Sequence, residues 1–141
     1  MSTLTENRMK IKKLSLLITL CIGFSHSLYA IPPDITGTYQ CNGYDPFGKV
    51  TYTNPLAITK TNDTYSFQWI ATTGSPLVLG TGFFHKNIDN AISVVFWDPR
   101  QNDYFGSEMF QILPDGTLNA NWTLQGQNLI GTETCSPTQV E

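Results

Sequence analysis

Apolar and polar residues alternate with a period of two along most of the chain after about residue 36. Between residues 64 and 71, for example, Tyr65, Phe67 and Trp69 alternate with Ser66 and Gln68. This period is typical of a strand that buries one face and exposes the other. No segment of this region keeps the 3.6-residue period of an amphipathic helix. The pattern therefore predicts an all-β domain.

Eight segments fit the alternation, and turn-forming residues separate them. The three-residue connections Thr61-Asn62-Asp63 and Pro114-Asp115-Gly116 have hairpin length and residue types that tolerate tight turns. Evenly spaced antiparallel strands of this kind predict a single up-and-down β-barrel, with a two-sheet β-sandwich as the alternative. The predicted strands are residues 37–43, 50–60, 64–71, 77–85, 91–97, 105–113, 117–124 and 129–135.

The first 30 residues have the order of a secretory signal peptide. Arg8, Lys10 and two further lysines precede an apolar run over residues 14–24, and a short polar stretch leads to Leu28-Tyr29-Ala30. The run of about 11 residues is shorter than the roughly 20 that a membrane-spanning helix needs, so no stable membrane anchor is predicted. We expect cleavage after Ala30, a periplasmic or secreted protein, and one barrel domain over residues 31–141.

Removal of residues 1–30 makes the remaining chain clearly acidic. It keeps four Lys and Arg residues against ten Asp and Glu residues, which gives a net charge of −6. A surface of this sign repels phosphate backbones and anionic lipid heads, and no basic cluster with interleaved aromatic residues remains. Nucleic acids and membrane surfaces are therefore not predicted partners.

Cys41 and Cys135 are the only cysteines that follow the predicted cleavage site. Export would place them in an oxidising compartment, where pairing closes a loop of about 95 residues and stabilises the fold by roughly 4–5 kcal/mol. The predicted strand ends offset the two cysteines by about 13 Å, whereas a disulfide needs Cα atoms within about 7 Å. Two free thiols are the alternative. His85 is the only histidine in this region, so no metal site or other cofactor is predicted.

The connections after the first, third, fifth and seventh strands must share one end of an up-and-down barrel. This end has the longest loop, residues 98–104, and two copies of an aromatic-Asp-Pro motif. Loops on a rigid scaffold favour binding, and apolar walls with a few polar groups are typical of ligand sites. We call this end the mouth. The candidate ligand-binding residues are Tyr44, Phe47, Trp69, Trp97, Tyr104 and Trp122.

Two other interpretations of these residues remain open. Asp-Pro pairs commonly begin turns, and aromatic side chains commonly fill small barrels. Strict alternation also places Trp97 on the opposite face from Val94 and Phe96, unless a bulge turns it inward.

Catalytic chemistry has few candidate residues in this sequence. A nucleophile needs an adjacent base and a group that orients it, and only His85 could act as a histidine base. Asp45, Asp98 and Asp103 could serve as paired carboxylates or as weak Ca²⁺ ligands, but their spacing is not specific for either role. The sequence predicts a non-catalytic binding protein with no catalytic residues.

Five short motifs follow one another across most of the chain after residue 30. The motifs are Gly37-Thr38-Tyr39, Thr64-Tyr65 with Trp69, Gly80-Thr81-Gly82, Asp115-Gly116-Thr117-Leu118 with Trp122, and Gly131-Thr132-Glu133. In this order the chain resembles a group of small secreted bacterial β-proteins, some of which are labelled fibronectin-binding. The resemblance implies a protein partner from a host matrix, such as fibronectin. The two cysteines and the long loop over residues 98–104 depart from the pattern of that group.

Two shorter resemblances give alternative functions. Ile35-Thr36-Gly37-Thr38-Tyr39 resembles the opening strand of avidin-like barrels, which implies a small ligand in a lipocalin-like or avidin-like cavity. Tyr39-Gln40-Cys41-Asn42-Gly43 is similar to periplasmic lysozyme-inhibitor barrels, although the Ser-Gly-x-Lys/Arg-Tyr loop of that group is absent. The predicted partner is therefore a protein or a small apolar ligand, and inhibition of a hydrolase such as lysozyme is a further alternative.

Overall fold

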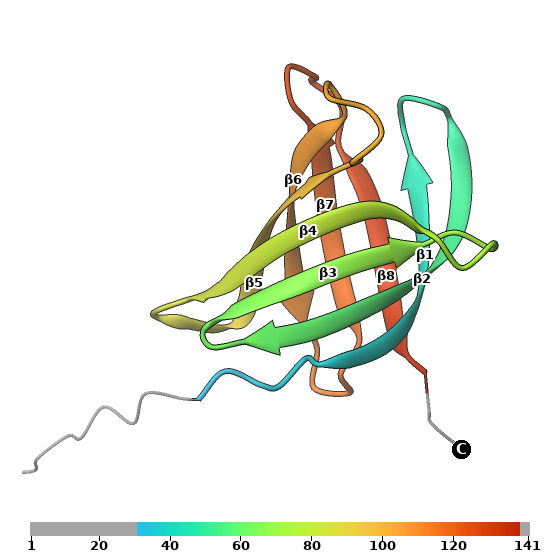
Figure 1. The fold of residues 1–141 in the computed structure, drawn as a ribbon. Helices are drawn as coiled ribbons and strands as arrows, with labels where there is room; N and C mark the ends of the chain where they lie inside the picture. Colours follow the sequence, from blue (N-terminus) through green and yellow to red (C-terminus); the bar gives the residue numbers. More distant parts are fainter. Residues whose placement is uncertain (1–30, 139–141) are drawn as a thin grey trace, which may run out of the picture.

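The computed structural model describes residues 31–138 as a closed barrel of eight antiparallel strands, in which each strand pairs with the next and β8 pairs with β1 (Figure 1). The predicted barrel is thus confirmed. The predicted signal peptide lies outside the described residues. The strands are β1 Gly37–Asp45, β2 Val50–Thr61, β3 Thr64–Ile70, β4 Pro76–His85, β5 Ile88–Trp97, β6 Phe105–Ile112, β7 Leu118–Leu124 and β8 Gly131–Pro137.

Within residues 31–138, no helix is long and apolar enough to cross a membrane.

A disulfide joins Cys41 on β1 to Cys135 on β8, which confirms the predicted pairing. The two residues are direct partners in the β1–β8 ladder, and their Cα atoms are 3.9 Å apart. The predicted offset between them was wrong because β1 continues to Asp45 and β8 begins only at Gly131. Both cysteines therefore lie in the middle of their strands.

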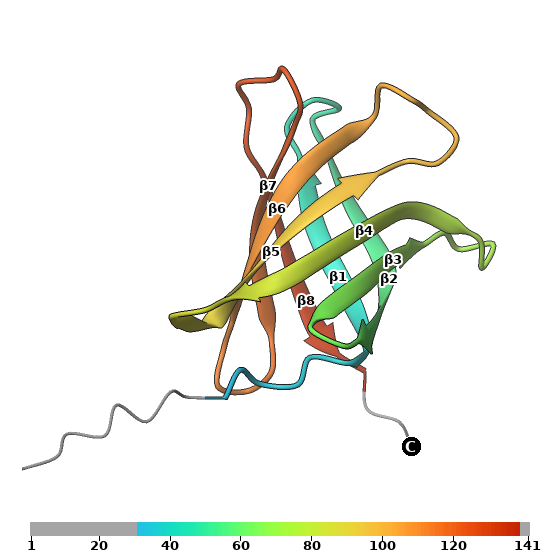
Figure 2. The same cartoon turned by 60° about the vertical axis from the view of Figure 1, so that its left-hand side comes forward.

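Side chains fill the half of the barrel away from the mouth. Phe67 and Phe110 stack with ring centroids 5.6 Å apart and planes only 8° from parallel. The segment before β1 crosses beneath this end in both views (Figures 1 and 2), and Ile35 from this segment is buried in the core. Its backbone carbonyl accepts a hydrogen bond of 3.0 Å from the Tyr39 hydroxyl. This end of the barrel is therefore closed.

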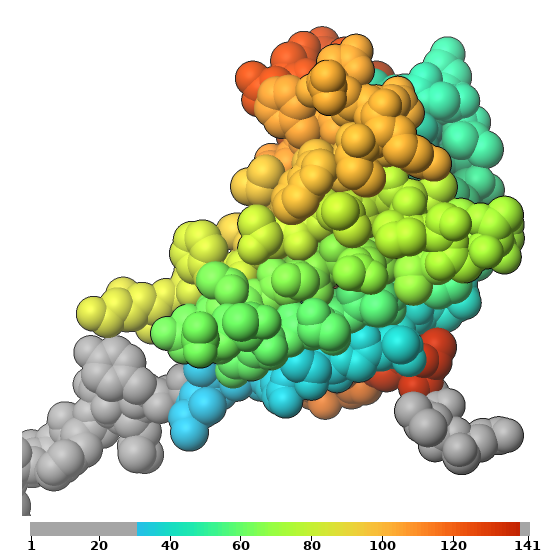
Figure 3. Space-filling model, viewed as in Figure 1, coloured from blue at the N-terminus to red at the C-terminus, as the bar shows by residue number. Residues whose placement is uncertain are grey.

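The four mouth connections join β1 to β2, β3 to β4, β5 to β6 and β7 to β8, at the opposite end. The loop between β5 and β6, drawn in orange, lies at the upper end of the molecule next to β4 (Figure 3). Asp98 N and Tyr104 O at the two ends of this loop form a backbone hydrogen bond of 2.9 Å. The longest predicted loop is therefore an ordered extension of the β5–β6 hairpin.

Replacement of both cysteines by alanine is expected to lower the free energy of unfolding by about 4–5 kcal/mol, because the disulfide closes a loop over 94 residues of sequence. Urea unfolding, followed by far-ultraviolet circular dichroism, measures the change. The Cys41→Ala single variant serves as a comparison, since it removes the bridge and leaves one thiol. A double variant as stable as the unaltered protein would contradict the expectation.

Candidate functional site

Three large aromatic side chains in the mouth half of the barrel lie opposite glycines on neighbouring strands. The direct cross-strand pairs are Tyr52 with Gly43, Phe96 with Gly106, and Trp122 with Gly131. A Cβ atom placed on any of these glycines would overlap the ring of its partner. The rings therefore lie flat against the barrel wall and leave space nearer the axis.

This space is a cavity of about 310 Å³ that opens at the mouth. Aromatic rings form much of its wall: the Phe96 centroid is 6.2 Å from that of Trp69, 6.2 Å from that of Trp122 and 6.3 Å from that of Tyr104. The volume is at the lower end of the range of about 300–1,000 Å³ for small-molecule sites. A filled core and a cavity thus occupy opposite halves of one barrel.

Two carboxyl groups, those of Glu108 on β6 and Glu133 on β8, line the cavity and are almost fully buried, with exposed fractions of 5% and 3%. The indole Nε1 of Trp69 donates a hydrogen bond of 3.1 Å to Glu133 Oε2. Glu108 Oε1 has no hydrogen-bond partner among the described residues. A buried acceptor without a donor is costly, by about 1–3 kcal/mol or more when it is charged.

The Sγ atom of Cys135 lies 3.3 Å from Glu133 Oε2. This sulfur has no proton to donate because it is bonded to Cys41. For the same reason the cluster of Cys41, Glu133 and Cys135 offers no thiolate to a metal ion. The contact instead places the disulfide, which is buried in the barrel core, next to a carboxyl group that lines the cavity.

Burial raises the pKa of the Glu108 carboxyl well above its ordinary value, and the nearby charge of Glu133 raises it further. Burial also raises the pKa of Glu133, although the hydrogen bond from Trp69 opposes this effect. Burial raises the pKa of the Tyr52 hydroxyl, which also faces the negative charges of both glutamates. The interior of the cavity therefore favours proton-bound carboxyls when nothing else neutralises them.

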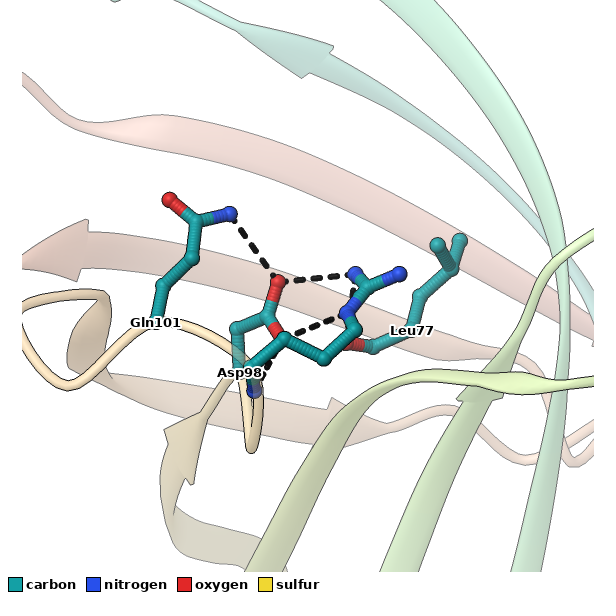
Figure 4. A network of polar contacts seen from close by, with 4 residues as sticks. Leu77, Asp98 and Gln101 are labelled. Atoms are coloured by element: carbon teal, nitrogen blue, oxygen red, sulfur yellow. Dashed lines mark hydrogen bonds and ion pairs between the residues drawn. The ribbon is translucent and has the colours of Figure 1, made fainter.

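At the rim, the Asp98 carboxylate forms an ion pair with Arg100, and Figure 4 shows the hydrogen bonds that converge on Asp98. The Asp98 carboxylate accepts hydrogen bonds of 2.8 Å from the Arg100 backbone nitrogen, Nε and Nη2, and one of 3.2 Å from Gln101. These hydrogen bonds from Arg100 hold the pKa of Asp98 well below its usual range. Arg100 Nη2 also donates to the Leu77 carbonyl at 3.3 Å, which ties the β5–β6 loop to the start of β4.

The structure brings three of the six predicted site residues to the cavity wall, namely Trp69, Tyr104 and Trp122. Phe47 packs against Trp122 with ring centroids 5.8 Å apart. Tyr44 and Trp97 point outward and are 43% and 37% exposed.

Trp97 lies on the outer face because β5 keeps its alternation through Phe96 and Trp97 without a bulge. Its direct partners on the neighbouring strands are Leu79 and Phe105. All three tryptophans therefore lie toward the mouth ends of their strands, but only Trp69 and Trp122 face the cavity.

Sequence reasoning missed the two glutamates. Each occupies an inward position of the alternating pattern: Glu108 between Gly106 and Phe110, and Glu133 two residues before Cys135. Charged residues are rarely fully buried unless they are paired. A carboxyl at a core position of a predicted strand was therefore the signal that could have identified both.

Comparison with known proteins characterises the fold. No protein-family model matches the chain, and no match was found among curated proteins. Among solved structures, the chain is similar to a redesigned beta barrel, with a TM-score of 0.58 and 14% sequence identity over 74% of this chain and 92% of that one. At this identity the likeness concerns the barrel architecture alone.

The Gly131→Ala substitution is expected to destabilise the protein by about 1–3 kcal/mol, because the added methyl group must displace the Trp122 ring. The ring can move only toward the cavity, so the environment of Trp122 should change as well. Urea unfolding and near-ultraviolet circular dichroism measure the two effects. Thr132→Ala, at the neighbouring outward position, is the matched control, and equal behaviour of the two variants would contradict the prediction.

The Glu108→Gln substitution is expected to stabilise the protein at pH 8 by about 1–3 kcal/mol and to change stability little at pH 4. Because the pKa of Glu108 is raised in the folded state, the folded chain binds more protons than the unfolded chain above the ordinary glutamate pKa. Its stability therefore falls as the pH rises toward the raised value.

Urea midpoints at the two pH values measure this difference. Asp63→Asn, in the exposed turn between β2 and β3, is the control for the loss of one negative charge. A stabilisation by Glu108→Gln that is equal at pH 4 and pH 8 would show that burial of the charge is not its cause.

Proposed function

We propose that this chain is an exported, non-catalytic binding protein that holds a small molecule in the mouth cavity of its barrel. The observation that carries the proposal is the unfilled mouth half, whose aromatic wall surrounds a buried carboxyl oxygen without a hydrogen-bond partner. Small-molecule sites commonly combine apolar walls with a few polar groups that orient the ligand.

The contrast between the two halves of the barrel supports this function. In the closed half, residues such as Phe67, Phe110 and Ile92 are fully buried in contact with one another. In the mouth half, the aromatic rings lie against glycines, and polar groups face the space that remains. A barrel that served only as a structural unit would gain stability from filling this space with apolar side chains.

The proposed export is supported by two features. The order of charged, apolar and small residues over residues 1–30 is that of a secretory signal, and the disulfide between Cys41 and Cys135 is consistent with an oxidising compartment. Periplasmic and secreted locations fit these features equally.

The test is a titration of the purified protein with a panel of small aromatic and aliphatic molecules that includes cations, neutral compounds and anions, followed by tryptophan fluorescence and calorimetry. We expect at least one member to bind saturably with a change in the emission of Trp69 and Trp122, which line the cavity. Asn54→Phe should weaken this binding at least tenfold because Asn54 also lines the cavity.

Thr53→Phe is the matched control, since Thr53 lies next to Asn54 on β2 and is exposed. It should leave the affinity within about twofold of the unaltered protein. Absence of saturable binding across the panel, or undiminished binding by Asn54→Phe, would overturn the cavity as the site.

A second candidate function is binding of a protein partner through the outer face of the barrel, as the resemblance to fibronectin-binding-labelled proteins implies. Large apolar residues on neighbouring strands are exposed there. They are Phe83, Val95, Trp97, Phe105 and Met109. Contiguous exposed apolar surface is characteristic of protein interaction sites. This face lies on the opposite side of the barrel wall from the cavity, so the two functions do not exclude each other.

A further inference from the structure

We propose that the ligand of the mouth cavity is a small organic cation, an amine in its ammonium form, that binds to the carboxyl groups of Glu108 and Glu133 between the aromatic walls. This inference rests on the proposed small-molecule function and specifies the chemical class of the ligand. Three independent features of the cavity support it.

The first feature is the imbalance of charge around the cavity. Four carboxyl groups line it, from Asp45, Asp98, Glu108 and Glu133, and Arg100 is the one basic side chain among the described lining residues. The Arg100 guanidinium is 2.8 Å from the Asp98 carboxylate and 59% exposed, so it is engaged at the rim. Glu108 and Glu133 therefore face the cavity without a cationic partner, and this arrangement attracts cations and repels anions.

The second feature is the free hydrogen-bonding capacity of Glu108. Its Oε1 atom is buried and has no donor, whereas Glu133 Oε2 already accepts from Trp69. A primary ammonium group has three N–H donors and no acceptor. Its hydrogen bonds to carboxylates are charge-assisted and about twice as strong as those between neutral groups. A ligand of this kind would satisfy the unpaired oxygen that the protein itself leaves without a partner.

The third feature is the aromatic wall. The rings of Trp69, Phe96, Tyr104 and Trp122 line the same cavity as the two glutamates. Ring faces attract cations, and the attraction reaches about 2 kcal/mol or more when the cation is removed from water. The rings also give apolar contact to the carbon skeleton of an amine, which an inorganic cation lacks.

Binding of such a cation is coupled to release of a proton. Burial raises the pKa of the glutamate pair, so at pH values below the raised pKa an arriving R–NH₃⁺ replaces a bound proton: the carboxyl O–H bond breaks, the proton passes to solvent, and the carboxylate pairs with the ammonium. The other charged or titratable groups that line the cavity with Glu108 are Asp45, Tyr52, Asp98, Arg100, Tyr104 and Glu133. Among the lining groups whose pKa is shifted, Asp98 has a lowered pKa beside Arg100 and both tyrosines have a raised pKa, so the glutamate pair is the carboxyl group whose raised pKa couples proton release to binding.

The experiment compares benzylamine, benzyl alcohol and benzoate, which have similar shapes and differ in charge. Calorimetric titrations at pH 5.5, 6.5 and 8 should show benzylamine binding at least tenfold more tightly than benzyl alcohol at pH 8, and benzoate not binding. The affinity for benzylamine should rise with pH, and titrations in two buffers of different ionisation enthalpy should detect the released proton at the lower pH values.

Glu108→Gln keeps the shape of the side chain without its charge. It should weaken benzylamine binding at least tenfold, reduce the difference in affinity between benzylamine and benzyl alcohol, and remove much of the pH dependence. Asp63→Asn, far from the cavity in the turn between β2 and β3, should alter none of these values.

The two proposals fail in different ways. Binding of benzyl alcohol or benzoate as tight as that of benzylamine, or benzylamine binding that Glu108→Gln does not weaken, would overturn the cationic ligand and leave the cavity as a binding site. Failure of all three probes, together with the wider panel, to bind would overturn both proposals.

Discussion

The geometry of the mouth depends on how closely an aromatic ring can approach the backbone of the neighbouring strand. Trp122 lies on Gly131, Phe96 on Gly106 and Tyr52 on Gly43, and each approach requires that the opposite residue has no Cβ atom. Any other residue would force the rings toward the barrel axis, where small barrels normally place their filling side chains. Because the rings lie against the wall, they enclose a cavity instead of occupying it, and the two buried carboxyl groups can face that space.

The disulfide stabilises the same region from outside the cavity. All neighbouring strands except β8 and β1 are joined by short connections, so the pairing of β8 with β1 closes the barrel between segments nearly 100 residues apart in sequence. The Cys41–Cys135 bond crosses this pairing at its middle, and its sulfur contacts Glu133. The strand that positions one of the two carboxyl groups is therefore fixed by a covalent link two residues away. The bond limits how far β8 can move, and it therefore limits the movements that would bring the buried Glu133 carboxyl into contact with water.

Period-two alternation predicted the eight strands, their order and the inward or outward side of most residues, because that alternation is a local property of each strand. Strict alternation left Trp97 on the outer face unless a bulge turned it inward, and the structure has no bulge there. Alternation alone does not determine the register across the β8–β1 pair, and an error of two residues at one end of each strand separated Cys41 from Cys135.

The cavity likewise depends on register: the hydrogen bond from Trp69 to Glu133 joins residues 64 positions apart, and the ring of Trp122 lies against a glycine on the next strand. The sequence was enough to predict which residue types lie near the mouth. Only the structure of the closed barrel shows that they surround two carboxyl groups.

Two carboxyl groups in the mouth half oppose the stability of the fold. An apolar side chain at either position would contribute about 1.5–3 kcal/mol through burial, whereas a buried carboxyl must lose hydration, and Glu108 recovers no hydrogen bond at Oε1. Their proximity increases the cost, because the charge of Glu133 disfavours ionisation of Glu108. A cation that enters the cavity offsets these costs, because the desolvated carboxylates then gain a partner in surroundings where water screens the attraction only weakly. The two buried carboxyl groups that destabilise the empty barrel are therefore the groups that would bind an ammonium group most strongly. A neutral ligand of equal shape would supply only the missing hydrogen bond to Glu108 Oε1.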